Sequence, residues 1–497
     1  VASLLLKIIA KITAFNIKNW SLRAVRTQEK QFKYLINRAK ETSFGLDHSF
    51  QEINSYKEFV KNVPIREYEG LRPYIERVKK GENNILWPGQ PIYFALTSGT
   101  TSGSKYIPIT KESLKNHLNG AKNAILNYVA QTGRTSFIKG KFIFIQGSPL
   151  LDKISKILIG RLSGISAHHI PFYMKSKMLP SWETNVIDDW ESKLERIIDE
   201  TIDKDMTIIS GIPSWIQMYF ERIVEKKQKK VGTIFQNFSL FVYGGVNFQP
   251  YERKFKSLIG RKIDSIELFP ASEGFYAFQD RQESKDLLLI LNDGIFYEFI
   301  EEKKYHLNVF DRIPIAEVCL NTNYVLIIST NAGLWAYNTG DTIQFTSINP
   351  YRVIVTGRVA QFLSAFGEHV IVKEVELAVE KACSMTGEIV NEFTVAPKFK
   401  KANETACHEW YIEFAKENPD IDSFQKSLDL ELRKQNKYYD DLILGKIIAE
   451  ATVRSIVKGG FSAYMKSIGK LGGQNKIPKI SNNRKLVDKL NKLNLVK

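Results

Sequence analysis

Short runs of β-branched and aromatic residues alternate with longer segments of helical periodicity along most of the chain. The runs lie at residues 142–145, 207–209, 240–242, 265–268 and 325–329, and Gly, Pro or Asn bounds them. Helical spacing of apolar residues is clear at residues 185–204 and again at 370–382. Brief apolar runs with such boundaries are typical of buried strands. Helices that alternate with buried strands predict an α/β body.

The length of 497 residues predicts more than one domain, because single hydrophobic cores stop growing near roughly 250–300 residues. After about residue 357 the pattern becomes helix, strand, strand, helix, which is typical of a small α+β unit. We therefore expect a large N-terminal domain with mixed β-sheets and helices at residues 1–356. A smaller α+β C-terminal domain follows at residues 357–497.

Positive charge is concentrated at the two ends of the chain. The formal net charge is +16, from 70 Lys and Arg against 54 Asp and Glu. Residues 1–50 hold nine bases and three acids, and residues 454–497 hold eleven bases and one acid, which leaves fifty of each sign between them. A nucleic-acid groove would need basic residues spread over the folded body, so we expect no nucleic-acid partner.

Three cysteines in the whole chain, Cys319, Cys383 and Cys407, form no paired spacing. The sequence therefore suggests neither a disulfide framework nor a thiolate zinc site. Cys407 and His408 are adjacent on an alternating segment, where neighbouring side chains point to opposite faces, so they do not suggest a nucleophile and its base. A reduced, cytoplasmic setting fits this cysteine usage.

The first fifteen residues are apolar but contain Lys7 and Lys11. They are too few for a membrane span, which needs about 20 apolar residues, and they lack the features of a signal peptide. Helical spacing predicts an amphipathic helix without stable membrane insertion. We expect it to pack on the body through its apolar residues, and attachment to a membrane surface stays open as an alternative. These residues are Leu4, Leu5, Ile8, Ile9 and Ile12.

The segment ALTSGTTSGSKYIPIT, at residues 95–110, has the composition of a phosphate loop. Small hydroxyl residues and glycines let backbone N–H and side-chain O–H groups converge on phosphate oxygens, and Lys105 supplies a countercharge. It is not a Walker A loop, because one residue too few separates the glycines and Ser104 precedes the lysine. The loop residues are Thr97, Ser98, Gly99, Thr100, Thr101, Ser102, Gly103 and Lys105.

Further short motifs follow in order. LFPASEG lies at residues 268–274, YNTGD at 337–341 and TGR at 356–358. GIPSW, YGGVNFQPYE, FLSAFGEHV and GGQNKIPK lie at residues 211–215, 243–252, 362–370 and 472–479. With the phosphate loop, the series resembles the adenylate-forming superfamily. More narrowly it resembles a bacterial-type member of the GH3 acyl acid–amido synthetase family, from roughly residue 30 to the C-terminus.

The resemblance implies a role for each motif in joining a carboxylate to the α-phosphate of ATP. Glu273 would hold Mg²⁺ on the phosphates, since a carboxylate is a hard ligand for a hard cation. Asp341 would accept the ribose hydroxyls, and Lys476 would approach the carboxylate and α-phosphate from a mobile domain. We expect catalytic roles for Lys476, Glu273 and Thr100.

The remaining candidates line the nucleotide or the acyl group. Glycines allow close backbone approach to a planar ring, so residues 244–246 are expected along the adenine. Arg358 would reach the ribose or phosphate beside a hinge at Gly357. The nucleotide candidates outside the loop are Gly244, Gly245, Val246, Ala271, Ser272, Asp341 and Arg358. The acyl-pocket candidates are Trp215, Phe275 and Tyr276, for which packing in the core is an equal alternative.

Two positions depart from the family pattern. Phe269 stands where the second motif usually has Tyr, and Asn338 stands where the family has Arg. Neither change affects Glu273 or Asp341, so ATP use is still expected. The expected function is ATP-dependent activation of a small carboxylic acid, followed by acyl transfer to an amine, an amino acid in particular. The alternatives are transfer to a thiol such as coenzyme A and a non-catalytic nucleotide or acyl binder.

Overall fold

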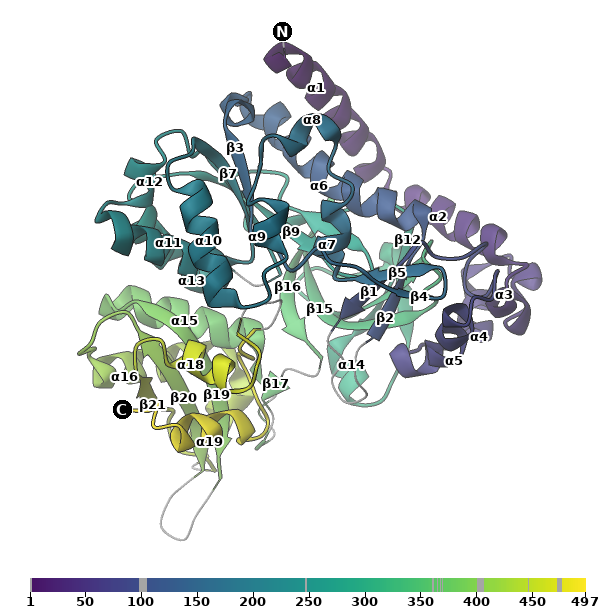
Figure 1. The fold of residues 1–497 in the computed structure, drawn as a ribbon. Helices are drawn as coiled ribbons and strands as arrows, with labels where there is room; N and C mark the ends of the chain where they lie inside the picture. The colour runs from purple at the N-terminus through teal and green to yellow at the C-terminus, as the bar shows by residue number, and fades with distance from the viewer. Residues whose placement is uncertain are drawn as a thin grey trace. The chain divides into compact units, whose positions relative to one another are not determined.

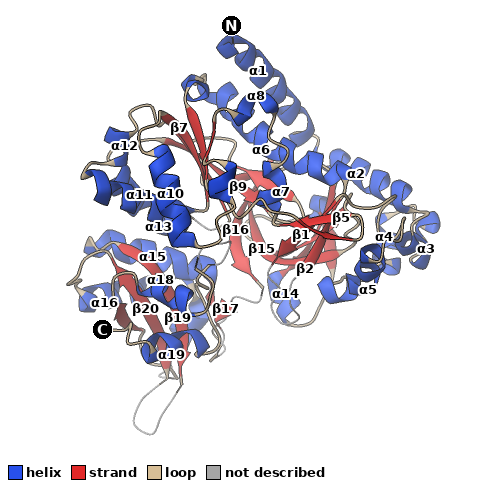
Figure 2. Ribbon diagram, in the orientation of Figure 1, coloured by secondary structure: helices blue, strands red, loops and turns tan. Residues whose placement is uncertain are grey.

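The computed structural model describes residues 2–97, 105–245, 248–359, 362–363, 365–366, 368, 370–399, 406–445, 447–471 and 476–497. The chain forms two compact units. The first comprises Val1–Ile212, Ile234–Gly245 and Ile263–Ile354. The second comprises Pro213–Thr233, Val246–Lys262 and Val355–Lys497. Figure 1 traces the elements along the chain, and Figure 2 separates helices from strands.

A large mixed sheet runs through the first unit. Its parallel part is β6 (Met178–Leu179), β3 (Lys141–Phe144), β7 (Met206–Gly211), β8 (Leu240–Gly244) and β9 (Asp264–Pro270). Beyond β9 the order is β10 (Phe275–Phe278), β11 (Leu287–Leu289), β16 (Tyr351–Arg358), β15 (Tyr337–Ile348), β14 (Asn323–Thr330), β12 (Ile295–Glu301) and β13 (Arg312–Pro314). Antiparallel pairing joins β9 to β10, β10 to β11, β11 to β16, β15 to β14, β14 to β12 and β12 to β13.

A smaller sheet of the same unit has the order β2 (Lys105–Ile109), β1 (Tyr93–Thr97), β5 (Ile157–Gly160) and β4 (Asp152–Ile154). The helices of this unit are α1 (Ala2–Ser21), α2 (Ala24–Ala39), α3 (Ser43–Asp47), α4 (Tyr56–Asn62), α5 (Tyr68–Lys79), α6 (Lys111–Thr132), α7 (Leu162–Ala167), α8 (Phe172–Lys175), α9 (Trp182–Asn185), α10 (Trp190–Thr201) and α14 (Glu302–His306). Single 3₁₀ turns cover Phe50–Glu52, Ser136–Lys139 and Ile315–Glu317.

Helix α6 is the main packing element against the centre of the large sheet. Thr110 and Ser113 cap each other's backbone N–H groups at its start, and Gly133 ends it with φ 69°, a left-handed conformation that glycine adopts without strain. Its buried residues Ala124 and Val129 share one apolar cluster with Ile266 on β9. This packing supports β9 and β10, the two strands that flank Glu273.

The second unit is built on a three-stranded sheet in the order β19 (Val390–Lys398), β20 (Cys407–Phe414) and β21 (Thr452–Ile456). A two-stranded pair, β17 (Phe362–Leu363) with β18 (Val370–Ile371), precedes it. The helices are α15 (Val372–Thr386), α16 (Ile421–Gln435), α17 (Lys437–Leu444), α18 (Gly460–Ser467) and α19 (Lys485–Lys492). Helices α11 (Pro213–Lys227) and α13 (Gln249–Ile259) group with this unit, and α12 (Val231–Ile234) leads back to the first unit.

The fold class expected from the sequence is confirmed. The five apolar runs form β3, β7, β8, β9 and β14, and the helices and strands expected after residue 357 are α15, β19, β20 and α16. The helix expected from residue 185 begins later, at Trp190, because Asp189 caps it by accepting a hydrogen bond from the Ser192 N–H at 2.8 Å.

Strand β20 is buried on both faces, although its sequence alternates. Trp410 and Ile412 belong to a core that includes residues of α15 and α16. Tyr411 belongs to a second core that includes residues of α18 and α19. The alternation of apolar and polar residues along this strand predicted a single apolar face, because a tyrosine, with its polar hydroxyl, is typical of a solvent-facing position.

Helix α1 packs on the body through a different face from the one predicted. Ala10 and Ile17 are buried against α6 with Leu6 beside them, whereas all five residues expected to pack are exposed. The helix is apolar nearly all round, so periodicity could not identify the packed face. No helix in the described part of the chain is long and apolar enough to cross a bilayer.

The domain boundary between residues 356 and 357 stays a prediction. Strand β16 passes through this position and ends at Arg358, and Gly357 has φ 142°. The second compact unit includes α11 and α13, which precede this position in the chain.

Candidate active site

Glu273 lies in the tight turn that joins β9 to β10. The N–H of Ala271 donates to the carbonyl of Gly274 at 2.8 Å, and the N–H of Gly274 donates back to Ala271 at 3.3 Å. A Cβ added at Gly274 would lie 2.6 Å from the Cδ1 of Ile295, so a larger residue there would have to displace that side chain. The turn therefore fixes Glu273, together with Ser272, at the end of β9.

Asp341 follows a bulge in β15 that its neighbours build. The Oδ1 of Asn338 accepts from the Gly340 N–H at 2.9 Å, and Gly340 has φ 75°. The hydroxyl of Thr339 accepts from the Asp341 N–H at 3.1 Å and donates to the Leu326 carbonyl at 2.9 Å. The NTGD sequence thus forms a local turn that holds Asp341, whose side chain is largely buried.

Tyr276 is a buried phenol on which the charges of Glu273 and Asp341 both act. Its side chain is fully buried, its ring packs edge-on against Phe269 and Tyr297, and among the described residues its hydroxyl has no hydrogen-bond partner. Burial raises the pKa of Tyr276 well above its ordinary value, and the negative charges of Glu273 and Asp341 raise it further. The charges of both carboxylates therefore act on the same buried phenol.

The two departures from the family pattern have structural roles here. The Phe269 ring centroid lies 5.0 Å from that of Tyr276, so it covers the buried phenol. The Nδ2 of Asn338 donates to the Tyr305 hydroxyl at 2.9 Å, in addition to the bond with Gly340. Asn338 and Tyr305 also line a cavity of about 450 Å³. The asparagine therefore shapes the turn before Asp341 rather than supplying a charge.

The expected phosphate loop joins β1 to β2, where Thr97 and Lys105 lie directly opposite each other in an antiparallel pair. The Lys105 ammonium lies 5.9 Å from the ring centroid of Tyr68, whose hydroxyl accepts from the Tyr106 N–H at 2.9 Å. Six of the predicted phosphate ligands lie outside the described residues. They are Ser98, Gly99, Thr100, Thr101, Ser102 and Gly103.

Gly244 and Gly245 end β8 beside the Glu273 turn, because Gly244 pairs with Leu268 on β9. A Cβ at Gly244 would lie 2.5 Å from the Leu268 carbonyl oxygen, so strand packing alone requires a glycine there. Gly245 has φ 82°. Ligands of open α/β sheets bind outside the carboxyl ends of the parallel strands, where both glycines and the turn lie. Val246 lies outside the described residues.

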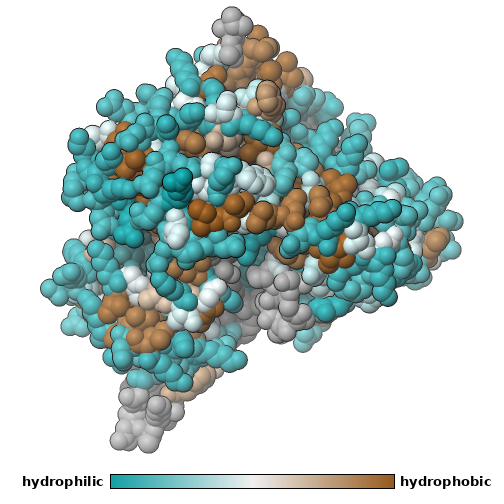
Figure 3. Space-filling view, viewed as in Figure 1, coloured by the Kyte–Doolittle hydropathy of each residue, from teal (hydrophilic) through white to brown (hydrophobic). Residues whose placement is uncertain are grey.

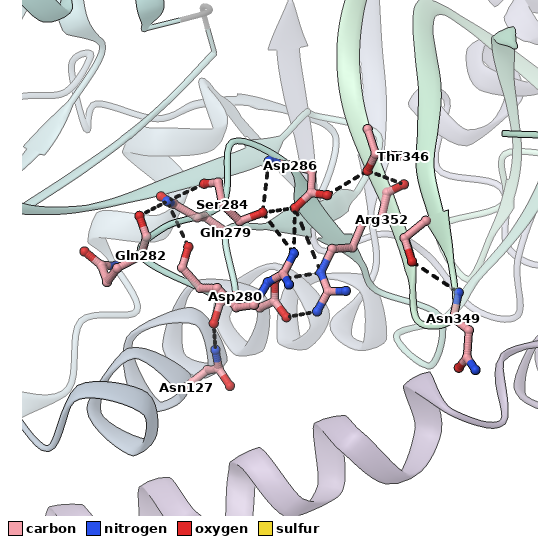
Figure 4. Close-up of polar contacts among 11 residues, drawn as sticks. Asn127, Gln279, Asp280, Gln282, Ser284, Asp286, Thr346, Asn349 and Arg352 are labelled. Carbon is pink, nitrogen blue, oxygen red and sulfur yellow. Dashed lines mark hydrogen bonds and ion pairs between the residues drawn. The ribbon is translucent and has the colours of Figure 1, made fainter. Parts of the chain in front are cut away.

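A polar cluster ties the segment after β10 to its neighbours (Figure 4). Arg352 on β16 donates to both carboxylate oxygens of Asp280, at 3.1 and 2.6 Å. Asn127 on α6 donates to the Asp280 carbonyl at 2.8 Å, and Thr346 on β15 donates to Asp286 at 2.7 Å. These bonds hold the segment that joins β10 to β11 against α6, β15 and β16.

In the second unit, Lys476 is exposed and precedes a segment that is attached to β19. The Val395 N–H donates to the Lys479 carbonyl at 3.0 Å, and the Ser481 N–H donates to the Val395 carbonyl at 3.0 Å. Ile477, next to Lys476, is buried. The backbone is therefore fixed within three residues of the lysine that we expect to be catalytic.

Sequence reasoning missed Lys479. Its ammonium is buried, donates to the Tyr251 hydroxyl at 3.1 Å, forms an ion pair with Glu392 and lies 4.5 Å from the Phe393 ring centroid. Burial alone would lower the pKa of Lys479, but the charges and hydrogen bonds of Glu392 and Tyr251 raise it, so the ammonium stays protonated. Both Tyr251 and Lys479 lie in motifs of the family series, which is the signal that could have identified them.

The other predicted residues lie in different surroundings. Arg358 is exposed at the end of β16, and Trp215 is buried on α11. Phe275 packs against α6, where a Cβ at Gly120 would lie 2.5 Å from its ring. Phe275 is thus part of the core of the first unit, and the acyl-pocket roles of Trp215, Phe275 and Tyr276 stay predictions.

The three cysteines are free. Cys407 contacts the Thr452 hydroxyl at 3.5 Å, whereas the Nε2 of His408 lies 2.9 Å from Glu368. The two adjacent side chains have separate partners, as expected for neighbours on a strand.

Within the described residues, no group of three or more His, Cys, Asp or Glu side chains could hold a metal ion by itself. Mg²⁺ is usually bound by one or two carboxylates together with substrate phosphates and waters. Glu273 offers such a carboxylate in a turn fixed by backbone hydrogen bonds. The donor set therefore fits a Mg²⁺ ion that arrives with phosphates.

Solved structures match nearly the whole chain. A structure of GH3.15 acyl acid amido synthetase has a TM-score of 0.79 at 14% identity and covers 97% of this chain and 96% of that chain. A 2-hydroxyisobutyryl-CoA ligase in the postadenylation state has a TM-score of 0.58 at 12% identity, with 96% and 91% covered. At these identities the matches show the fold, which is that of adenylate-forming enzymes.

Curated relatives match over a short stretch only. The chain is 45% identical over 62 residues to the indole-3-acetic acid-amido synthetase GH3.15 of Arabidopsis thaliana, which is 12% of this chain and 10% of that protein. It is 45% identical over 58 residues to the probable indole-3-acetic acid-amido synthetase GH3.13 of Oryza sativa subsp. japonica, which is 11% of this chain and 12% of that protein.

Three family models match the chain in order. They are the GH3 family N-terminal domain at residues 15–263, the GH3 family central domain at 288–358 and the GH3 family C-terminal domain at 373–485. The first alone covers half of the chain, and the resemblance seen in the motifs is confirmed. The chain belongs to the GH3 family.

Proposed function

We propose that this protein is an ATP-dependent ligase that activates a carboxylic acid as an acyl-adenylate and transfers the acyl group to an amine, in particular an amino acid. The turn that fixes Glu273 at the carboxyl end of β9, where Gly244 of β8 pairs with Leu268, carries this proposal. Ligands of this class of sheet bind outside the carboxyl ends of the parallel strands. The charge of Asp341, far from Glu273 in sequence, acts on the same buried Tyr276 as that of Glu273.

The first unit would bind the nucleotide. Thr97 and Lys105 hold the two ends of the loop expected to surround the phosphates, with Thr100 near its centre. Asp341 would accept the ribose hydroxyls, and the backbone at Gly244 and Gly245 would lie along the adenine. Ala271 and Ser272 are further proposed contacts in this unit, and Arg358 is a proposed contact that belongs to the second unit.

Glu273 would hold Mg²⁺ against the phosphates of ATP. When bound there, the ion neutralises charge on the phosphate oxygens. The role of the chain is to fix the carboxylate, and the hydrogen bonds between Ala271 and Gly274 do this before any ligand arrives. A positioned charge needs little reorganisation during the reaction.

Lys476 would supply positive charge where the carboxylate attacks the α-phosphate and pyrophosphate leaves. Negative charge develops between these groups, and an ammonium close to it lowers the barrier. The attachment of residues 479–481 to β19 limits how far Lys476 can move. Movement of the C-terminal domain about Gly357 between the two half-reactions is part of this proposal.

The amine acceptor is supported by family membership and by the names of the curated relatives, which are acid-amido synthetases. Transfer to a thiol such as coenzyme A is the alternative within the same chemistry. We also propose a cytoplasmic setting, since all three cysteines are free and free thiols persist in reducing compartments.

The test is pyrophosphate exchange into ATP with a panel of carboxylic acids. The panel includes indole-3-acetic acid, which the curated relatives' names give, and 2,4-DB, which is bound in a matching structure. We expect exchange that depends on one class of acid and on Mg²⁺. Absence of exchange with every acid, for a protein that still binds ATP, would support the binder alternative.

The acceptor is identified in a second step. The responsive acid and ATP are incubated with a mixture of amino acids or with coenzyme A, and mass spectrometry detects an amide or a thioester. Amide formation with an amino acid is the expected result, and a thioester alone would replace the amido synthetase proposal.

A further inference from the structure

Helix α1 uses only one narrow face to pack on the first unit. Ala10 and Ile17 are buried against α6, with Leu6 beside them, and the Ser3 hydroxyl lies 2.6 Å from the hydroxyl of Thr135. These positions are spaced by three, four and seven residues, which places them on one side of the helix. The helix is therefore held along the body, and its opposite side faces outward.

The outward side carries a continuous row of large apolar side chains, which we call the α1 apolar row. Figure 3 shows this surface as a brown area over α1. Contiguous exposed apolar surface of this kind marks an interaction site rather than ordinary surface variation. The row and its exposed fractions are Leu4 66%, Leu5 56%, Ile8 49%, Ile9 43%, Ile12 58% and Phe15 67%.

Three exposed lysines lie along one flank of this row. Lys7, Lys11 and Lys18 are spaced by four and seven residues, so they share one side of the helix between its packed face and the apolar row. No acidic residue precedes Glu29 in the chain. The exposed Arg23 and Arg26 extend the positive charge beyond the end of α1.

We propose that α1 binds the surface of a membrane that contains anionic lipids. The apolar row would enter the boundary between headgroups and acyl chains while the lysine flank contacts lipid phosphates. The helix would lie flat in the interface, because its packed face stays on α6. This inference is independent of the proposed catalytic function.

Charge favours this partner over a second copy of the chain. Two α1 helices that pack by their apolar rows bring their lysine flanks close together without any acid on either helix, and like charges repel. An anionic bilayer supplies both the apolar phase and the opposite charge.

The test is cosedimentation of the full chain with vesicles. One set contains phosphatidylcholine alone, and the other contains equimolar phosphatidylcholine and phosphatidylglycerol. We expect binding about tenfold or more tighter to the anionic vesicles, and weaker binding at high salt, because salt screens the lysine flank. Equal sedimentation with both sets, or none with either, overturns the proposal.

A triple variant and a matched control test whether the α1 apolar row, and not exposed apolar surface in general, is needed for vesicle binding. Ile8→Ser, Ile12→Ser and Phe15→Ser together should reduce vesicle binding about tenfold or more. The control replaces apolar residues of similar exposure elsewhere and should bind as the parent does. Its substitutions are Leu46→Ser, Met385→Ser and Leu444→Ser, at 59%, 58% and 65% exposure.

The charge is tested in the same way. Lys7→Glu, Lys11→Glu and Lys18→Glu together should abolish the preference for anionic vesicles. The control has the same change in net charge at exposed lysines of the second unit and should keep the preference: Lys426→Glu, Lys458→Glu and Lys470→Glu. Equal loss in both variants would show that net charge alone drives binding and would overturn the assignment to α1.

Light scattering in the absence of vesicles tests whether a second copy of the chain binds the α1 apolar row instead. A monomer with an intact α1 apolar row supports the membrane proposal. A dimer that the three serine substitutions disperse, in a protein that does not sediment with vesicles, would assign the row to a second copy of the chain instead.

Discussion

Lys479 donates a hydrogen bond to the Tyr251 hydroxyl at 3.1 Å and forms an ion pair with Glu392. The lysine follows Lys476 by three residues, whereas Tyr251 lies on α13 and Glu392 on β19. The carbonyl of Lys479 also accepts a hydrogen bond from the Val395 N–H. The segment that follows the proposed catalytic lysine is thus fixed both by the buried charge of Lys479 and by backbone hydrogen bonds.

Replacing Lys479 by Met should destabilise the protein, because Glu392, whose side chain is only 16% exposed, loses its partner. Loss of one partner of a buried ion pair costs about 3–5 kcal/mol. Urea denaturation measures the free energy of unfolding, and adding Glu392→Gln to the variant should restore part of it. Equal stability of the parent and the single variant would contradict the importance of this pair. We also expect kcat to fall in the folded variant while KM for ATP changes little, because Lys479 positions Lys476.

Replacing Lys476 by Ala should reduce acid-dependent pyrophosphate exchange by about 10²-fold or more, the size of effect seen when one stabilising group is removed from a transition state. Binding of ATP, measured by calorimetry, should be largely retained. The control is Lys485→Ala, another exposed lysine of the same tail, and it should leave exchange unchanged. Normal exchange in the Lys476 variant would refute its assignment.

Replacing Tyr276 by Phe should stabilise the ligand-free protein by about 1 kcal/mol, because it removes a buried hydroxyl that has no partner among the described residues. Tyr439→Phe is the contrasting variant. Its hydroxyl donates to Asp429 at 2.6 Å, so its removal should destabilise by about 1–2 kcal/mol. Thermal unfolding without nucleotide should show a more stable Tyr276→Phe variant and a less stable Tyr439→Phe variant. Destabilisation by Tyr276→Phe would contradict the prediction.

His117 should make the protein less stable in mild acid. Burial lowers the pKa of His117 from 6.5 to about 4 in the folded protein. As pH falls from about 6.5 to about 4, the unfolded chain therefore takes up a proton that the folded protein does not. The contribution of His117 to stability is fully present above this range and is lost as pH falls through it, with a loss of about 2 kcal/mol near pH 5.

The variant His117→Gln isolates this contribution, because its side chain is neutral at every pH in the range. Urea denaturation near neutral pH and near pH 5 should show a smaller acid-induced loss in the variant than in the parent. Identical losses would mean that His117 is protonated in the folded state.

Replacing Arg352 by Ala should destabilise the first unit by about 3 kcal/mol, because it leaves the largely buried carboxylate of Asp280 without its two hydrogen bonds. Arg281 is the matched control. It contacts Asp286 with a half-exposed side chain, so Arg281→Ala should cost less than about 1 kcal/mol. Denaturation curves give the loss of unfolding free energy in each variant. Similar losses would contradict the claim that the buried ion pair matters more than the exposed one.

Local patterns predicted much of this fold and part of its site. The five apolar runs became strands, because strand formation here follows from nearest neighbours and burial. The hairpin that brings Thr97 opposite Lys105 is also local. Lys479 could not be predicted in this way. It lies in a strongly basic tail and is separated by 228 residues from Tyr251 and by 87 residues from Glu392.

The sequence by itself determined the family, the order of the motifs and the turns that hold Glu273 and Asp341, because each depends on a few adjacent residues. Only the tertiary structure decided that the charges of both carboxylates act on Tyr276, since β10, β11 and β16 lie between β9 and β15 in the sheet and no local pattern links the two segments. The packed face of α1 was decided in the same way. The helix is apolar on nearly every side, so the surface of α6, and not the periodicity of α1, selected the face that is buried.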